Sequence, residues 1–465
     1  MIRLATLFLA LFVLFSCKTI KIDPPAPEFK FITEISTADP SFLSIATELS
    51  LKPYLVEADQ ALEQKFSGEV KQCEGVSYKY NFYRDPLVFS LKDNEVLSDI
   101  RGKFDLSLSY CPGCHDLFGE PNCMVPRIYA SCGVGEPKKA VQISYLSKII
   151  ISEQFTLRSQ TKLKGFELLD PCKITVFQYD ATPTIEKEVR KSLIALEKEI
   201  DKQLALAPVR ETMTDVWKAL QDPILVAPYG YFYLMPSHIG IADFSLKNEG
   251  QKALFTTQLL AQPVFSTNEL EQQVSNLPKN TPLPNAPNTS IFNLRTIASF
   301  DSINQYLARD FEKQLIQIND KKSISLDSVK ILGPQGERMV LSVAFSGAKN
   351  GLLYLVVKPY IDVQQHFRIR EVDYELKTKS VLLHSAKWLL NSKLKEQIES
   401  SVDVDLSALL LETRSAIEQQ INGEISPGVW LNGKIESLRV QDLFLTSGHL
   451  IIDVRLEGLL KLKIK

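Results

Sequence analysis

The pattern of apolar and polar positions predicts that one strand-and-helix arrangement occurs twice. Near the start, apolar residues alternate as in a half-buried strand and then recur every three or four positions, as on one helix face: Leu43, Ile45 and Thr47, followed by Leu51, Tyr54, Ala58, Leu62 and Phe66. The pattern returns 249 residues later, at Phe292, Leu294 and Thr296, followed by Phe300, Ile303, Leu307, Phe311 and Leu315. Agreement in order and spacing indicates an internal repeat.

Later segments of the two halves correspond as well. Each half has an alternating strand ending in aspartate, at Asp180 and at Asp373, and each strand leads toward amphipathic helices. The helix expected in the first half carries one apolar face, formed by Ile185, Val189, Leu193, Leu196, Ile200 and Leu204. Strands with short connections fill the intervals, which indicates antiparallel pairing. The predicted fold class is α+β, with two tandem repeats that each wrap a curled antiparallel β-sheet around long amphipathic helices.

These patterns divide the chain into five parts. Residues 1–16 are expected to be a signal peptide, 17–38 a polar, proline-bearing tether, 39–275 the first repeat and 291–465 the second. The first repeat contains a cysteine-rich insertion over 111–126. Segment 276–290 is rich in proline and asparagine and is predicted to cross between the repeats, because its prolines do not fit a regular element.

The first residues predict an exported lipoprotein. Arg3 precedes an apolar run over 4–15, which is shorter than the about 20 residues that a membrane-spanning helix needs. Small Ser16 and then Cys17 follow, so cleavage would leave Cys17 as the first residue, lipidated on its sulfur. A secretion signal with an incidental cysteine is the alternative. Lys18 gives no reason to expect retention at the inner membrane, so the outer membrane of a bacterial envelope is the expected location.

Composition excludes several functions. The net charge of −2 gives no electrostatic basis for binding nucleic acid. With five histidines, the chain shows no Ser/His/Asp spacing, phosphate loop or paired-histidine metal motif, so we expect neither an enzyme nor a metal site. Asp403 and Asp405 are expected to be helix caps, and the aromatic run 229–233 is expected to be a strand with one face in the core.

Two motif groups carry a family resemblance. The first is Ser131-Cys132-Gly133 with Gly135-Glu136-Pro137, and the second is Asp170-Pro171-Cys172-Lys173-Ile174-Thr175 followed by Asp180-Ala181-Thr182. With the opening strand and helix, they resemble a bacterial envelope family known as domain of unknown function 4403. That family has no established activity. Its layout resembles tandem tubular lipid-binding (TULIP) domains, the fold of the bactericidal/permeability-increasing protein, which implies sheets enclosing apolar tubes.

Six cysteines follow Cys17, and an even number in an exported chain favours disulfides. We prefer the pair Cys132–Cys172, and the remaining candidates are Cys73, Cys111, Cys114 and Cys123. Two alternatives remain open. Cys111, Cys114 and His115 fit the spacing of c-type haem attachment, and the same residues with Cys123 could ligate zinc.

The expected function is binding or carrying an apolar ligand, such as lipid, at a membrane reached through the N-terminal anchor. The candidate lining residues are Leu62, Phe66, Leu193, Leu196, Ile200, Phe311 and Leu315. The alternative is a structural or interaction lipoprotein of the outer membrane, in which the same residues fill closed cores and no ligand binds.

Overall fold

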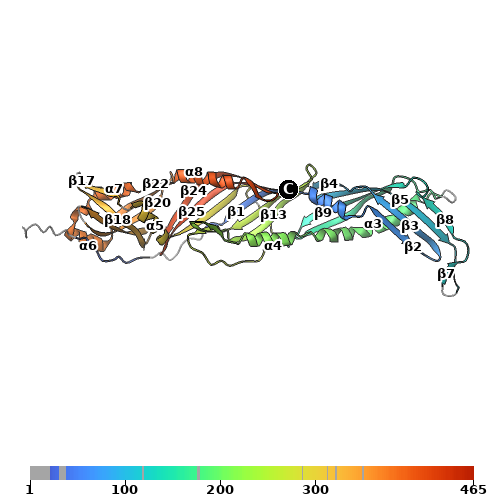
Figure 1. The fold of residues 1–465 in the computed structure, drawn as a ribbon, viewed down its shortest axis with the longest axis horizontal. Coiled ribbons are helices and arrows are strands. Elements are labelled where there is room, and N and C mark those ends of the chain that lie inside the picture. Colours follow the sequence, from blue (N-terminus) through green and yellow to red (C-terminus); the bar gives the residue numbers. More distant parts are fainter. Residues whose placement is uncertain are drawn as a thin grey trace, which may run out of the picture.

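The computed structural model describes residues 21–30, 38–117, 120–174, 179–284, 286–311, 313–319, 322–347 and 350–465. Cys17 and the predicted signal peptide therefore lie outside the described residues. The molecule is elongated and rich in β-sheet, and the sheet is strongly curled (Figure 1). The C-terminus lies near the middle of the long axis.

The first half contains most of the strands. They are β1 (Ser41–Ser50), β2 (Lys65–Val70), β3 (Gly75–Arg84), β4 (Val88–Asp93), β5 (Glu95–Cys111), β6 (Cys114–Leu117), β7 (Glu120–Cys123), β8 (Ile128–Cys132), β9 (Lys139–Ile151), β10 (Leu157–Leu168), β11 (Ile224–Val226), β12 (Gly230–Tyr233), β13 (Pro236–Lys247), β14 (Lys252–Ala261) and β15 (Val264–Ser266). The helices are α2 (Lys52–Ala61), α3 (Thr182–Ala205) and α4 (Val209–Ala219).

The second half contains more helices. Its strands are β16 (Ser290–Ser299), β17 (Leu315–Asn319), β18 (Lys322–Gln335), β19 (Arg338–Gly347), β20 (Gly351–Ile361), β21 (His366–Tyr374), β22 (Asp403–Asp405), β23 (Gly423–Ser426), β24 (Val429–Leu445) and β25 (His449–Ile464). Its helices are α5 (Phe300–Phe311), α6 (Leu376–Ser385), the 3₁₀ helix η2 (Lys387–Leu390), α7 (Ser392–Ser401) and α8 (Leu406–Gln420).

A sheet of 17 strands runs from one end of the molecule through its centre. At the end farthest from α6, β2 pairs with β3, β3 with β5, and β5 with β8 and β9, all antiparallel. At the centre, β1 pairs along its length with β14 and, on its other side, in parallel with β25. The first strand of the chain is therefore hydrogen-bonded to the last, and the two halves share one sheet.

The six strands β17 to β22 form a second sheet at the opposite end, with α5, α6 and α7 packed against it. Its core is filled by apolar side chains from both the sheet and the helices, including Val357, Leu382 and Leu389, each at most 1% exposed. The turn from β21 into α6 leaves an edge of β20 free, and Ile22 pairs with that edge at Gly351. Part of the predicted tether is thus bound to this sheet.

Polar side chains fix several helices to strand backbones at β-bulges. The register of β10 shifts between Leu163 and Gly165, and Glu197 of α3 accepts a hydrogen bond from the Leu163 N–H (2.9 Å). In the second half, Asn304 of α5 bonds both backbone groups of Ile331, where β18 bulges. These backbone groups lie on the side of the strand that has no neighbouring strand at that point, and the helices supply their partners.

Two helices end earlier than the apolar spacing predicts. α2 ends at Ala61, and Phe66 lies on β2, so the predicted helical position of Phe66 is wrong. Leu315 likewise begins β17 rather than extending α5. The physical reason at α2 is Arg84, whose guanidinium donates to the carbonyl oxygens of Asp59, Leu62 and Glu63. These bonds satisfy the carbonyl groups at the helix end and turn the chain into β2.

The other predicted elements are close to the observed ones. β1 and β16 begin 249 positions apart, since 290 minus 41 is 249, which is the spacing of the predicted strands. α3 spans the predicted apolar face, and α8 follows the expected break at 402–405. The strand expected to end at Asp180 falls partly outside the described residues, with only a Lys173–Asp180 bridge described. Segment 276–290 contains no helix or strand before Ser290 in its described part.

Candidate ligand-binding site

One face of the sheet farthest from α6 is apolar and partly open to solvent. The register pairs Val76 with Tyr110, Tyr78 with Leu108, and Tyr110 with Ile128, so these side chains share a face. The same face of β2 carries Phe66 and Val70, opposite Phe82 and Tyr78. We call this set the distal face; it consists of Phe66, Val70, Val76, Tyr78, Tyr80, Phe82, Leu108, Tyr110 and Ile128.

The opposite face of the same strands is polar and internally hydrogen-bonded. Ser67 donates to Asn81 (3.0 Å), and the Asn81 amide donates to Asp105 (2.7 Å), which also pairs with Lys138 (2.7 Å). Burial opposes ionisation of Asp105, but the bonds from Lys138 and Asn81 prevail and hold its pKa below the usual value. The strict alternation of polar and apolar residues makes this sheet two-sided.

Exposure along the distal face rises toward its outer end. Phe104 and Leu106 on β5 are at most 9% exposed beneath the start of α3, whereas Val76 is 47%, Tyr110 45% and Ile128 48% exposed. Tyr78 and Tyr80 are each 38% exposed. The apolar surface therefore continues from a closed core to an open end.

Local packing holds the aromatic side chains of the distal face in place. The rings of Phe66 and Phe82 stack with centroids 6.2 Å apart. The ring of Tyr80 lies over Gly68, where a Cβ atom would come within 2.4 Å of it. The absence of a Cβ atom at Gly68 therefore leaves the space that the Tyr80 ring occupies on β2.

Helix α3 covers the inner part of this sheet face. Ile185, Val189 and Leu193 pack on the core formed by β5, β9 and β10, and Leu193 is the buried residue of the helix. The Tyr145 hydroxyl donates to the Leu193 carbonyl at 3.0 Å, and burial raises the pKa of Tyr145 to about 12. The outer side of α3 faces solvent, where Ile194 is 49% exposed.

Three disulfides join the six described cysteines. Cys132–Cys172, the pair preferred from the sequence, ties β8 to the segment before α3. Cys73–Cys114 and Cys111–Cys123 fasten the β6–β7 hairpin, which projects at the tip of the molecule (Figure 1). Cys111 and Cys114 are thus bonded to other cysteines, rather than presenting free thiols to the haem or zinc considered above. The Nδ1 atom of His115 is buried without a hydrogen-bond partner.

The predicted lining residues are divided between the face and the surface. Phe66 belongs to the distal face, while Leu193 and Ile200 pack in the adjoining core. Leu62 and Leu196 are 44% and 48% exposed outside that core, and Leu315 is 72% exposed on β17. Phe311 ends α5, and its side chain lies outside the described part of the structure. The residues brought together thus come mainly from strands.

Sequence reasoning missed most of the distal face. Val76, Tyr78, Tyr80 and Phe82 alternate with polar residues along β3, and this period of two could have identified the face. Its exposure was not predictable, because the exposure depends on where α3 begins relative to the sheet.

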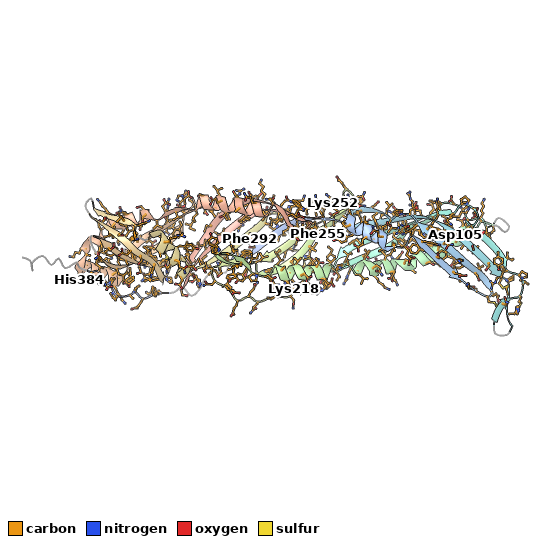
Figure 2. All side chains as sticks on the ribbon, in the orientation of Figure 1. Asp105, Lys218, Lys252, Phe255, Phe292 and His384 are labelled. Carbon is orange, nitrogen blue, oxygen red and sulfur yellow. A yellow bond between two sulfur atoms is a disulfide. The ribbon has the colours of Figure 1, made fainter. Side chains whose placement is uncertain are left out.

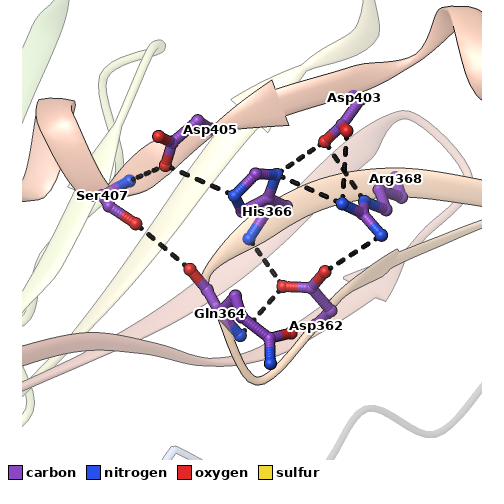
Figure 3. Close-up of polar contacts among 7 residues, drawn as sticks. All are labelled: Asp362, Gln364, His366, Arg368, Asp403, Asp405 and Ser407. Atoms are coloured by element: carbon purple, nitrogen blue, oxygen red, sulfur yellow. Dashed lines mark hydrogen bonds and ion pairs between the residues drawn. The ribbon is translucent and has the colours of Figure 1, made fainter.

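A polar cluster centred on His366 forms a second candidate (Figure 3). The His366 Nδ1 atom lies 2.6 Å from Asp403, which also binds Arg368 (3.1 Å), and Arg368 reaches Asp362 (3.4 Å). The hydrogen bond to Asp403 raises the pKa of His366, and the bonds from His366 and Arg368 lower the pKa of Asp403. Asp405 accepts from the Ser407 N–H (2.8 Å) and caps α8 as expected.

The same cluster lies where the two large sheets meet. Gln365, next to His366, bonds the backbone N–H of Val440 on β24 (2.6 Å), and its carbonyl accepts from the Leu406 N–H at the start of α8 (3.0 Å). The Ser407 hydroxyl is occupied by the Gln364 carbonyl. This arrangement pairs charges and joins elements, so we interpret it as structural.

The other features of the described residues give less support for a functional site. In the described part of the chain, no three His, Cys, Asp or Glu side chains are grouped so as to hold a metal ion. No helix among the described residues has both the length and the apolar character needed to span a bilayer. A surface recess of about 450 Å³ lies over β1 and β25 and is bordered by Ser44, Thr256 and Lys461, remote in sequence from the distal face.

Comparisons with known proteins give the following. A family model described as "Domain of unknown function (DUF4403)" matches residues 39–464. No curated protein sequence matches the chain. The crystal structure of a lipopolysaccharide binding protein aligns at 9% identity, covering 92% of this chain and 100% of that one, with a TM-score of 0.25. P47 of Clostridium botulinum E1 aligns at 9% identity, covering 89% and 98%, with a TM-score of 0.18. TM-scores this low leave function to be argued from the chain itself.

Proposed function

The chain belongs to this family of unknown function, and we propose that it is an envelope lipoprotein that holds an apolar ligand, such as a lipid acyl chain, on the distal face. The observation that carries the proposal is the exposure of Val76, Tyr78, Tyr80, Tyr110 and Ile128 on one side of a sheet whose other side is polar. A two-sided sheet ordinarily has its apolar side covered. A bound apolar ligand supplies that cover.

The binding energy required is modest and needs no reactive group. Removal of apolar surface from water contributes about 25 cal/mol per Å², or about 0.8 kcal/mol per methylene. About eight methylenes seated on the distal face would supply about 6 kcal/mol before the loss of ligand freedom is subtracted. The aromatic side chains are held in place before binding, which limits that loss. We accordingly propose a binding protein without enzymatic activity or cofactor.

We further propose that the chain consists of two duplicated TULIP-like domains, of which the first binds the ligand. The support for duplication is the offset of 249 positions between β1 and β16, followed in each case by a helix and a strand. The core between α5–α7 and the second sheet is filled by its own side chains, such as Phe345 and Leu355. That filled core favours the first half as the binding domain.

The anchor is part of the same proposal. Cys17 would carry the lipid that retains the protein at the bacterial outer membrane. Metabolic labelling with a radioactive fatty acid tests this directly: a labelled wild-type band that is lost in Cys17→Ser is expected. Equal labelling of both proteins contradicts lipidation at Cys17.

Ligand binding is tested by titrating the purified chain with dansyl-labelled undecanoic acid and following the dansyl fluorescence. Tyr78→Asp places a charge on the distal face at a partly exposed position, so the fold should persist. The apparent Kd should rise at least about tenfold, since a carboxylate beside an acyl chain loses its hydration. Native mass spectrometry of the wild-type protein should show a lipid adduct that Tyr78→Asp lacks.

The matched control is Tyr129→Asp. Tyr129 is 70% exposed on β8, and it pairs with Ser109, so its side chain lies on the polar face. This variant should bind the probe like the wild type. Equal binding by both variants, or an adduct-free wild type that does not bind the probe, contradicts the proposal and supports the structural role instead.

A further inference from the structure

The N-terminal segment is bound to one end of the molecule. The Ile22 N–H donates to the Asn350 carbonyl (3.3 Å), the Leu352 N–H donates to the Ile22 carbonyl (2.7 Å), and Ile22 is 1% exposed. Further along, the Lys30 N–H donates to Pro334 (3.2 Å), and the Gly336 N–H donates to Lys30 (3.0 Å). The described chain therefore begins firmly attached beside β20 and α6.

The same end presents an exposed stripe on α6, which contains two leucines, a serine and a histidine. Leu376, Ser380, Leu383 and His384 recur at the spacing of one helix face and are all exposed, Leu376 at 79% and Leu383 at 46%. Figure 2 shows His384 at one end of the long axis, with Asp105 toward the other. The stripe thus points away from the rest of the molecule.

Lysines lie near this stripe. The segment from α6 to the end of α7 contains five lysines, at 377, 379, 387, 393 and 395, and two glutamates, at 396 and 399. Lys377 pairs with Glu28, and Lys379 and Lys395 pair with Asp373, so Lys387 and Lys393 are the two that the described ion pairs leave to other partners. Lys387 and Lys393 are exposed, and Glu399 accepts from the Val372 N–H. A recess of about 420 Å³ opens between Lys21 and Asp23 on one side and Ser380, Val381 and His384 on the other.

We propose that the end of the molecule formed by α6, η2 and α7 docks on an anionic lipid bilayer. Leu376 and Leu383 enter the interface, and Lys387 and Lys393 lie over anionic headgroups, each favoured by about 1 kcal/mol. The inference rests on the proposed anchor at Cys17. Ile22 is five positions after Cys17, so the residue that carries the lipid lies at most about 18 Å from the fixed Ile22. A membrane that holds the lipid must therefore approach this end.

An environment-sensitive fluorophore tests the docking. The lipidated chain, purified from bacterial membranes, carries Leu383→Cys labelled with NBD and is reconstituted into vesicles of phosphatidylglycerol and phosphatidylcholine. A blue-shifted emission is expected, and it should be absent in pure phosphatidylcholine. Raising the NaCl concentration from 0.15 to 1 M should reverse the blue shift, because the Debye screening length falls from about 8 to about 3 Å. The matched label is Val216→Cys on α4, 42% exposed, which should not shift.

Charge variants complete the test. Lys387→Gln with Lys393→Gln should lower the ratio of docked to undocked protein about 25-fold, or about fivefold per lysine. Lys187→Gln with Lys198→Gln, two exposed lysines of α3, should leave it unchanged. Vesicle-bound protein whose Leu383 label does not shift overturns docking but leaves the anchor intact. Protein that fails to associate with either vesicle overturns both.

Discussion

At the scale of single residues, Arg84 shows how one side chain determines where an element ends. Its side chain is 3% exposed and contacts Asp59, Leu62 and Glu63 at the end of α2. The Leu87 N–H and Arg84 together hold the pKa of Asp59 below its usual value. One buried cation thus satisfies the helix end and fixes the turn into β2.

Replacing Arg84 with alanine should lower the free energy of unfolding by about 3 kcal/mol, because the carbonyl groups and Asp59 would lose their buried donor. Urea denaturation followed by circular dichroism measures the change. Arg101→Ala, at an exposed position on β5, should change it by less than about 0.5 kcal/mol. Equal losses in the two variants would show that Arg84 has no such role.

The same residue explains a limit of sequence reasoning. Leu62 and Phe66 continue the helical spacing of α2, so periodicity alone extends the helix to Phe66. What ends it is a guanidinium that lies 22 positions away from Leu62 in sequence. The disulfide Cys132–Cys172 was the pair preferred from the sequence, and both cysteines lie in the motifs that carry the family resemblance. The other two pairs follow from how the β6–β7 hairpin folds back.

At the scale of elements, α3 is attached to β10 by polar bonds as well as by apolar packing. Glu197 accepts from Leu163, Asp201 accepts from the Thr161 N–H (3.0 Å), and Glu186 accepts from the Leu168 N–H (3.2 Å). β10 pairs on its other side with β9. The carboxylates of α3 therefore occupy backbone donors along the strand where a further strand would otherwise bind.

The bond to the Leu163 N–H lowers the pKa of Glu197, against burial, and Lys162 assists. A carboxyl with a lower pKa in the folded state stabilises the fold above its unfolded value of 4.5, and this contribution is lost as pH falls through the folded value. Glu197→Gln should therefore be about 1 kcal/mol less stable than wild type at pH 7, with the gap closing below pH 4.5. Urea unfolding at several pH values measures the gap.

Glu188→Gln is the matched control for that experiment, because Glu188 is exposed on α3 and pairs with Lys191. Its stability should stay close to wild type across the range. A Glu197→Gln deficit that is independent of pH would mean that the amide fits poorly, and that the charge of Glu197 has no role.

At the scale of the whole molecule, the two sheets are joined beside the His366 cluster, by hydrogen bonds between Gln365 and Val440 of β24. His366 faces Asp403 and Asp405 from β22, together with Asp362 and Arg368 near its own strand. Three carboxylates thus face one permanent cation and one titratable group. The junction is most favourable when His366 is protonated.

Because the pKa of His366 is raised above 6.5, the stabilisation by its protonated form is complete below pH 6.5 and is lost as pH rises through the folded value. Hydrogen exchange of the Val440 and Leu406 amides, which bond Gln365, should therefore be faster at pH 8.5 than at pH 6 after correction for intrinsic rates. His366→Gln should remove this difference. A wild-type difference that persists in His366→Gln would exclude the histidine as its origin.

The sequence did not predict which strands of the two halves pair with each other. Alternation identifies β1 and β16 as strands, but it does not reveal that β1 pairs with β25, about 415 positions away. Local periodicity specifies which side of a strand is apolar, and not which strand lies beside it. For the same reason Ile22 was assigned to a free tether, although it pairs with Gly351.

The pairing of β1 with β25 also affects the order in which the central sheet can form. A chain synthesised from its N-terminus presents Ile45 early and Leu460, its parallel partner, almost last. Until then the backbone N–H and C=O groups on one edge of β1 lack their strand partner, and such an edge is prone to pair with other chains. Completion of the central sheet therefore requires the last strand, and a translation product stopped before Leu460 would leave this edge of β1 without its partner.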